Sequence, residues 1–388
     1  MPEANQPTRA EQNTPSEVPP PGHIDGPFDS RSIDLGRIES LQVLDEHGQV
    51  EDGLDPKYDD ETLLKVHRAM VLTRAFDARM LAMQRQGQMG TFAPNLGQEA
   101  CMIGQVWSLG PDDWFAPSYR SFGAQIWRGW SMEHLMRLWA GYHSGFPPPD
   151  GVKDLPFSIV IGSHVLPSVG LAMAMRRAQD AHCAVVNFGD GAFSQGSVSE
   201  ALNFAAVEQA PIVFVCENNG WAISTPIDKQ SGNDVLATRG LGFGVRSLRV
   251  DGNDILAMMM ATQEACRRAR EGQGPTLIEA VTYRMSLHTT ADDPSVYRDE
   301  SLVDAWKNRC PIARFETYLA NRNLLSSEQA DQVRAACEQE VLDARTQFRE
   351  TAVAEPRQIF DHLYAEMPDE LEEQRLEYLR RLDRKGVK

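Results

Sequence analysis

Short runs of β-branched and aromatic residues alternate with helical patterns from residue 156 to residue 283, and this alternation limits the fold more than any other feature. The runs are continuously apolar, which is typical of strands that are buried on both faces. Each run is followed by a segment with apolar residues three or four positions apart, which indicates an amphipathic helix. Repeated strand–helix–strand units predict an α/β fold with a parallel sheet and helices on both faces.

The expected elements follow one another in a fixed order. Strands are predicted for "FSIVIG", "AVVNF", "PIVFV", "VRSLRV" and "TLIEAV", and helices for "SVGLAMAMRRAQ", "SVSEALNFAAVEQ" and "DILAMMMATQEACRRAR". Ser197 and Glu200 have the spacing of a capping box, so we expect a helix to begin there. Helical extensions are predicted before and after this region, in "DDETLLKVHRAMVLTRAFDARMLAMQRQG" and "SSEQADQVRAACEQEVLDARTQF".

Three parts of the chain are expected from these patterns. Residues 1–55 are rich in Pro, Glu, Asp and Gln and show little periodicity, which predicts a disordered or mobile arm. Residues 56–320 are expected to form the α/β domain, and residues 321–388 a helical C-terminal extension.

The composition excludes several classes of partner. A formal net charge of -17 argues against nucleic acid or an anionic membrane as the main partner. No window holds the roughly 18 apolar residues that a membrane helix needs, and the N-terminal stretch lacks the pattern of a secretory signal. The six cysteines show no CxxC spacing, as expected for buried thiols in a reducing compartment. We therefore expect a cytoplasmic protein.

Two polar turns follow consecutive predicted strands. Asp190, between Gly189 and Gly191, comes after the first strand, and Asn219 comes after the second. In a parallel sheet with a right-handed crossover, both turns lie at the same edge, where ligands bind. Carboxylate and amide oxygens suit magnesium, and glycines let a phosphate approach the backbone closely. The pair therefore predicts a magnesium–diphosphate site.

Each turn taken alone has an ordinary explanation. Gly-Asp-Gly and Asn-Asn-Gly are more often tight turns than metal sites. Their occurrence together, about 29 residues apart on consecutive strands, is what favours the metal site.

The chain resembles the alpha subunit of the first, decarboxylating component of 2-oxo acid dehydrogenase complexes. The paired turns are similar to the thiamin-diphosphate motif. Other matching stretches run in family order from about residue 58 to the C-terminus, and they include "RQGQMGTFAPNLGQEA", "PSYRSF", "LRVDGND", "GPTLIEAVTYR", "HTTADDPSVYR" and "LYAEMPDELEEQ". The resemblance implies a thiamin-diphosphate-binding fold, with thiamin diphosphate and Mg²⁺ as cofactors.

The resemblance also assigns residues to the site. It implies metal ligands at Asp190, Asn219 and the main-chain carbonyl of Trp221. It implies His288 as the catalytic residue, which would donate hydrogen bonds or protons to a carbonyl oxygen or a lipoyl sulfur. The cofactor contacts that it implies are Tyr119, Arg120, Ile159, Ile161, Gly189, Asp190, Gly191, Ala192, Asn219 and His288.

Several of these residues have simpler explanations. Arg120 could be a surface cation at a turn. Ile159 and Ile161 could be core residues of the sheet, a role that does not exclude contact with the cofactor. His288 could be an ordinary surface or core histidine.

The implied activity is the thiamin-dependent oxidative decarboxylation of a 2-oxo acid with reductive acylation of lipoyl groups. Thiamin catalysis of this type needs two α/β modules and an activating glutamate, and this chain has room for only one module. The glutamate is therefore expected from a beta subunit, in an assembly of two alpha and two beta chains. A lipoyl-bearing acyltransferase core would be the next partner. Pyruvate is the favoured substrate, and 3-methyl-2-oxobutanoate is the alternative.

Two other classes of protein are weighed against this interpretation. A stand-alone thiamin decarboxylase would need the second module and its glutamate in the same chain. A non-catalytic nucleotide-binding scaffold subunit would more naturally carry GxGxxG after an early strand, and it would not need the pair Asp190 and Asn219.

Overall fold

A parallel sheet of six strands lies at the centre of the fold. The computed structural model describes residues 36–50, 53–352, 358–361 and 363–386. The strands are ordered β1-β7-β8-β4-β3-β2 across the sheet, and every neighbouring pair is parallel. Their bounds are β1 Glu39–Leu41, β2 Trp114–Ala116, β3 Ala184–Gly189, β4 Ile212–Asn218, β7 Arg246–Asp251 and β8 Thr276–Val281. A separate antiparallel pair consists of β5 Trp221–Ala222 and β6 Thr225–Pro226.

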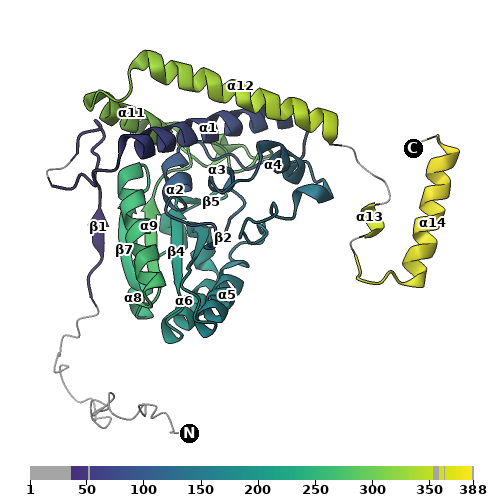
Figure 1. The fold of residues 1–388 in the computed structure, drawn as a ribbon, viewed down its shortest axis with the longest axis horizontal. Helices are drawn as coiled ribbons and strands as arrows, with labels where there is room; N and C mark the ends of the chain where they lie inside the picture. The colour runs from purple at the N-terminus through teal and green to yellow at the C-terminus, as the bar shows by residue number, and fades with distance from the viewer. Residues whose placement is uncertain (1–35, 51–52, 353–357, 362, 387–388) are drawn as a thin grey trace, which may run out of the picture. The chain divides into compact units, whose positions relative to one another are not determined.

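Helices cover both faces of this sheet (Figure 1), and two more, α13 and α14, belong to the C-terminal segment. Their bounds are α1 Asp60–Arg85, α2 Glu99–Gly104, α3 Phe122–Trp127, α4 Met132–Trp139, α5 Val165–Arg177, α6 Gly196–Val207, α7 Ile227–Gln230, α8 Thr238–Gly242, α9 Ile255–Arg270, α10 Glu300–Lys307, α11 Pro311–Asn321, α12 Ser327–Thr351, α13 Gln358–Asp361 and α14 Asp369–Arg384. Short 3₁₀ helices are η1 His143–Gly145, η2 Asp190–Ser194 and η3 Pro294–Val296.

The strands are continuously apolar because both faces of the sheet are covered. In β4, Val213 and Val215 point into the core that contains α1, α2 and α9, whereas Phe214 and Cys216 point into the core that contains α5 and α6. All seven residues of β4 are buried. This confirms the predicted parallel sheet with helices on both faces.

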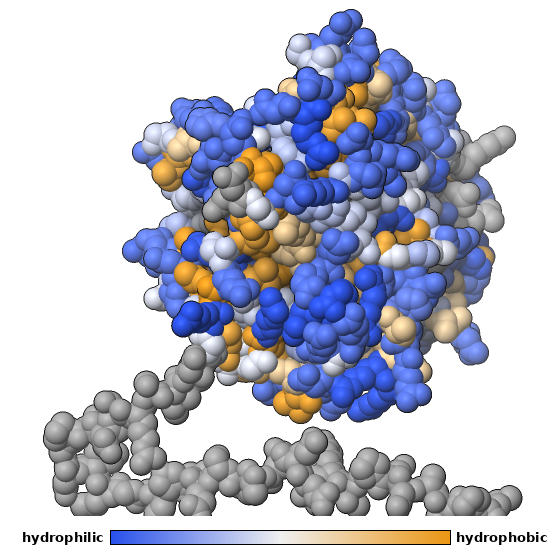
Figure 2. Space-filling view, turned by 60° about the vertical axis from the view of Figure 1, so that its left-hand side comes forward, coloured by the Kyte–Doolittle hydropathy of each residue, from blue (hydrophilic) through white to orange (hydrophobic). Residues whose placement is uncertain are grey.

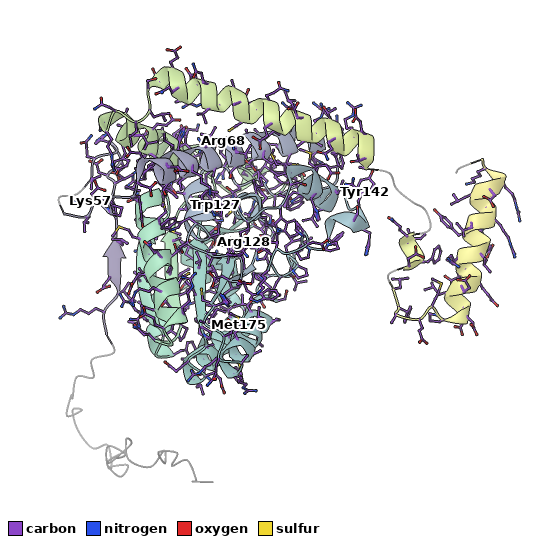
Figure 3. The ribbon with its side chains drawn as sticks, viewed as in Figure 1. Lys57, Arg68, Trp127, Arg128, Tyr142 and Met175 are labelled. Atoms are coloured by element: carbon purple, nitrogen blue, oxygen red, sulfur yellow. The ribbon has the colours of Figure 1, made fainter. Side chains whose placement is uncertain are left out.

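Two long helices form an outer layer on one side. Helix α12 packs along α1 and also contacts α4 (Figure 1). Arg68, which Figure 3 labels, lies on α1 and donates a hydrogen bond to Glu340 on α12. A capping box of Ser326 and Gln329 starts α12. The helices that the sequence predicts before and after the sheet region are therefore both formed, and they pack on one another.

The prediction of a strand at "FSIVIG" is wrong. Residues 157–162 form bends and turns and contact the sheet edge at one isolated bridge, between Ser118 and Ser158. The exposed fractions of Ile159 and Ile161 are 68% and 43%, so neither side chain is in the core. The edge strand is instead the shorter β2, and Gly162, at a φ of +75°, breaks the extended path before α5.

The predicted capping box at Ser197 is also wrong. Helix α6 begins at Gly196, its N-cap is Gln195, and no side chain caps its first turn. The helix starts earlier because η2 already turns the chain directly after β3. Ser197 therefore lies inside the first turn, where its side chain cannot act as the cap.

The predicted arm lies mostly outside the described residues. Its described part contains β1, which pairs with β7 at the edge of the sheet. Residues 39–41 therefore form an edge strand, which pairing with β7 supplies with backbone hydrogen bonds. The boundaries proposed at residues 55 and 320 stay a prediction.

The face shown in Figure 2 is mostly hydrophilic, and its apolar residues form small separate groups. Among the described residues, no helix is both long enough and apolar enough to cross a membrane.

Replacing Asp254 with alanine should destabilise the fold strongly. Asp254 is fully buried, and one carboxylate oxygen accepts hydrogen bonds from the amides of Leu256 and Ala257 at the start of α9. The other oxygen accepts from Val43 and Leu44, both at 2.6 Å. We expect Asp254→Ala to lower the free energy of unfolding by about 3 kcal/mol, measured by urea denaturation.

The matched control is Asp299→Ala, which removes the exposed N-cap of α10. This variant should lose at most about 1 kcal/mol. Equal losses in the two variants would contradict the role given to Asp254.

Candidate functional site

A cavity of about 250 Å³ opens at the carboxyl-terminal edge of the sheet. Strands β3 and β4 are neighbours in register, with Gly189 opposite Glu217. The turns that follow them therefore meet, and Asp190, Asn219 and Trp221 all line this cavity. This is the place where open parallel sheets bind ligands.

Asp190 is held at the start of η2, directly after β3. Its exposed fraction is 2%, and its carboxylate accepts a hydrogen bond from Nε2 of Gln230 at 3.1 Å. Burial raises the pKa of Asp190 to about 6, against the opposing effect of that hydrogen bond. A carboxylate kept ionised here at neutral pH costs stability, and a bound cation would offset that cost.

Asn219 is fixed by a tight turn after β4. Its Oδ1 accepts a hydrogen bond from the amide of Trp221 at 3.2 Å, and its Nδ2 donates to Oε1 of Gln98 at 3.1 Å. Gly220 supports the turn with a φ of +82°. The ring of Trp221 packs against Tyr297, with centroids 5.4 Å apart. The side chain of Trp221 is thus used for packing, which leaves its backbone as the candidate ligand.

The two glycines of the first turn differ in whether the surrounding packing requires glycine at that position. A Cβ at Gly191 would lie 2.8 Å from Cβ of Ala222, so β5 can approach η2 only if residue 191 is glycine. A Cβ at Gly189 would meet only the carbonyl oxygen of Glu217, at 3.9 Å. Local packing therefore explains Gly191 but not Gly189. Both residues line the cavity, as does Ala192.

Arg120 is a buried part of the site rather than a surface cation. Its exposed fraction is 5%, and one guanidinium nitrogen donates to the carbonyl of Pro94. The other donates to Nδ1 of His288 at 2.8 Å and to the carbonyl of His288 at 2.7 Å. Tyr119 lines the cavity beside Arg120, and its ring centroid lies 6.4 Å from that of His288.

His288 lies in a loop that hydrogen bonds hold in place. The loop residue Asp292 accepts from the amide of His288 at 2.7 Å and from the hydroxyl of Tyr297 at 2.6 Å. Burial, Arg120 and Arg284 together lower the pKa of His288 to about 3, although Asp292 opposes them. His288 is therefore a neutral imidazole at physiological pH, not an ordinary surface histidine.

The two predicted isoleucines occupy different positions. Ile161 lines the cavity, whereas Ile159 is not among its lining residues. Val160 and Ile223 also line the cavity and are 70% and 57% exposed. The mouth of the cavity is thus rimmed by exposed aliphatic side chains, a pattern that marks interaction surfaces.

Sequence reasoning assigned no role to two charged residues that lie in the cavity lining or beside it. Glu217 lines the cavity with an exposed fraction of 3%, and burial raises its pKa to about 7 against hydrogen bonds from Asn187 and Gln105. Arg284 follows β8, the strand on the other side of β4. The sequence did carry a signal for each of them. Glu217 is an acid within the apolar run that precedes the asparagines, and Arg284 is a cation directly after a third predicted strand.

The residues around the cavity suit an anion with a divalent cation. Arg120 and Arg284 supply positive charge, and Asp190 and Asn219 supply hard oxygen ligands. Two buried polar atoms next to these groups, Nε2 of Gln98 and Oε1 of Gln230, have no hydrogen-bond partner. Within the described residues, no cluster of three or more His, Cys, Asp and Glu side chains could hold a metal alone. A phosphate-bridged ion fits this donor set.

Comparisons with known proteins show the family of this chain. The family described as "Dehydrogenase E1 component" matches residues 67–357. A pyruvate dehydrogenase E1 component subunit alpha from Acholeplasma laidlawii is 44% identical over 89% of this chain and 100% of the relative. A 3-methyl-2-oxobutanoate dehydrogenase subunit alpha from Mycobacterium tuberculosis is 41% identical over 81% of this chain and 86% of the relative. A pyruvate dehydrogenase E1 component subunit alpha from Staphylococcus aureus is 36% identical over 87% of this chain and 92% of the relative. The chain belongs to the dehydrogenase E1 component family of oxidoreductases.

Proposed function

We propose that this chain is the alpha subunit of a pyruvate dehydrogenase and that its cavity holds thiamin diphosphate together with Mg²⁺. The observation that carries the proposal is the meeting of Asp190 and Asn219 in one cavity, at the ends of neighbouring parallel strands. Their oxygens would bind the ion, with the carbonyl of Trp221 as a third ligand. Such donors have no comparable use in a scaffold subunit.

The other residues of the cavity would orient the cofactor and its substrate. Arg120 and Tyr119 would contact the phosphate end, because a guanidinium fork matches phosphate oxygens. Gly189, Gly191 and Ala192 would let the diphosphate lie against the backbone. Thiamin diphosphate, when bound, would supply a nucleophilic carbon and an electron sink for the decarboxylation of the 2-oxo acid. His288 would then donate a hydrogen bond to an oxygen or sulfur of the reacting groups.

A beta subunit would complete the site. The described residues contain one parallel sheet and therefore one α/β module. Glu99 is paired with Arg74, and Glu200 is exposed on α6, so neither is available to activate the cofactor. The exposed aliphatic rim of the cavity is a surface that the partner would cover. We infer an assembly of two alpha and two beta chains, which works in the cytoplasm and passes its acyl group to a lipoyl-bearing core.

Pyruvate is the preferred substrate in this proposal, and 3-methyl-2-oxobutanoate is the alternative. Relatives with each substrate in their names cover most of the chain, at 44% and 41% identity. The two acids differ in a side chain of a few carbons, and each methylene changes the discrimination by only about 1–3 kcal/mol.

Replacing Asp190 with asparagine should stabilise the unliganded chain and abolish its response to the cofactor. The pKa of Asp190 is raised from 3.8 to about 6, so the native state binds more protons than the unfolded state between these values, and the ionised carboxylate lowers stability above them. We expect Asp190→Asn to raise the free energy of unfolding by about 3 kcal/mol at pH 7 and by nothing below about pH 4.

The same variant, mixed with the beta chain, should show no rise in melting temperature when thiamin diphosphate and Mg²⁺ are added. The wild-type mixture should show that rise. Asp293→Asn is the control, because Asp293 is exposed and lies outside the cavity lining. A full cofactor response in Asp190→Asn would contradict the proposed site.

The substrate assignment predicts a clear ratio of rates. In the assembled enzyme, kcat/KM for pyruvate should exceed that for 3-methyl-2-oxobutanoate by at least about tenfold, because a pocket shaped for a methyl group excludes a branched side chain. Steady-state decarboxylation assays with both acids measure this ratio. A ratio in the opposite direction would assign the branched-chain activity.

A further inference from the structure

His288 receives hydrogen bonds from two arginines at the same ring nitrogen. Nη2 of Arg120 lies 2.8 Å from Nδ1 of His288, and Nη1 of Arg284 lies 3.2 Å from it. The two arginines come from different parts of the fold, since Arg120 precedes α3 and Arg284 follows β8. Further hydrogen bonds hold each guanidinium, from Arg120 to Pro94 and from Arg284 to Tyr297.

This arrangement determines which nitrogen of His288 carries the proton. A guanidinium is only a donor, so Nδ1 must present its lone pair to both arginines. In a neutral imidazole the proton is then on Nε2. Nε2 has no hydrogen-bond partner among the described residues, and His288 lines the cavity. The free donor therefore lies at the Nε2 edge of the ring, away from the Nδ1 edge that Arg120 and Arg284 occupy.

We propose that Arg284 is a positioning residue that, together with Arg120, locks His288 in the neutral Nε2–H tautomer, so that His288 serves the cavity as a hydrogen-bond donor and not as a proton carrier. The inference rests on the proposed function for the identity of the acceptor, which would be an oxygen or sulfur of the reacting groups. The tautomer itself depends only on residues of this chain.

The charges around His288 all bear on this proposal. Arg120 and Arg284 disfavour the imidazolium, and Asp292, which accepts from the backbone amide of His288, is the acid that favours it. The hydroxyl of Tyr297 donates a hydrogen bond to Asp292, and the ring of Tyr119 packs edge-on against the ring of His288. Two cations against one acid leave the neutral form favoured, in agreement with a pKa of about 3 for His288.

The chemical consequence is that His288 donates hydrogen bonds while other groups transfer protons. A histidine that cannot take up a second proton at working pH cannot shuttle protons, but it can stabilise negative charge that develops on an oxygen or sulfur. Arg284 contributes by holding the ring and by repelling the second proton. Proton transfer in the reaction must then be carried out by other groups of the assembly.

Nitrogen-15 NMR of the full chain labelled in its histidines tests the tautomer directly. The His288 signals are assigned as those missing from His288→Gln. We expect one ring nitrogen with a bound hydrogen and one without, and no change from about pH 5.5 to about pH 8.5, while ordinary histidines titrate. A hydrogen on Nδ1, or a His288 titration within this range, would overturn the proposal.

The arginine variants test the cause. Arg284→Met removes one donor and one positive charge, so His288 should begin to titrate within the same pH range. Arg284→Lys restores the charge and should suppress that titration at least partly, and its fold can be checked independently by circular dichroism. If His288 stays neutral with hydrogen on Nε2 in Arg284→Met, the role given to Arg284 is wrong.

Two substitutions of His288 test the function of the donor in the assembled enzyme. The amide of glutamine can replace the Nε2–H donor, whereas that of asparagine reaches only the position of Nδ1. We expect His288→Gln to retain at least about tenfold more kcat than His288→Asn. Equal loss in both would show that His288 does not act as a simple donor. Because the NMR result needs neither cofactor nor partner, failure of the tautomer can be distinguished from failure of the proposed function.

Discussion

The parallel, in-register pairing of β3 and β4 is the constraint on which the site depends. It places the turn that begins at Asp190 beside the turn that contains Asn219, at the carboxyl edge of the sheet. The pairing of β4 with β8 then brings Arg284 to the same edge. His288, in the loop beyond Arg284, lines the cavity together with those two turns, because three neighbouring strands run in the same direction.

Without a ligand, the buried charges of the site lower the stability of the fold. Asp190 and Glu217 are both buried, and burial raises the pKa of each toward neutrality. On the other side, Arg120 and Arg284 are buried close to the same histidine, and burial followed by Arg120 lowers the pKa of Arg284 to about 10. A metal ion would offset the cost of burying the acids, and a diphosphate would offset the cost of burying the arginines. Ligand binding would therefore stabilise the fold.

The elements that sequence reasoning found are those with a strong local pattern. The continuous apolar runs of β3 and β4 and the periodicity of α1 and α12 need no knowledge of the tertiary fold. The strands β1 and β2 have three residues each, too few to show a pattern, and they form only because a neighbouring strand offers hydrogen bonds. The opposite error occurred at residues 157–162, where an apolar run lies at the surface.

The site was predictable where resemblance or turn chemistry named a residue, as at Asp190 and Asn219. The two arginines on one nitrogen of His288 depend on side-chain placement that no spacing reveals. The central claim, that these turns hold a divalent ion against a diphosphate, is tested most directly by anomalous diffraction from crystals of the alpha–beta assembly grown with thiamin diphosphate and Mn²⁺. The account predicts a manganese peak bounded by Asp190, Asn219 and the carbonyl of Trp221. An ordered cofactor with its manganese elsewhere would contradict it.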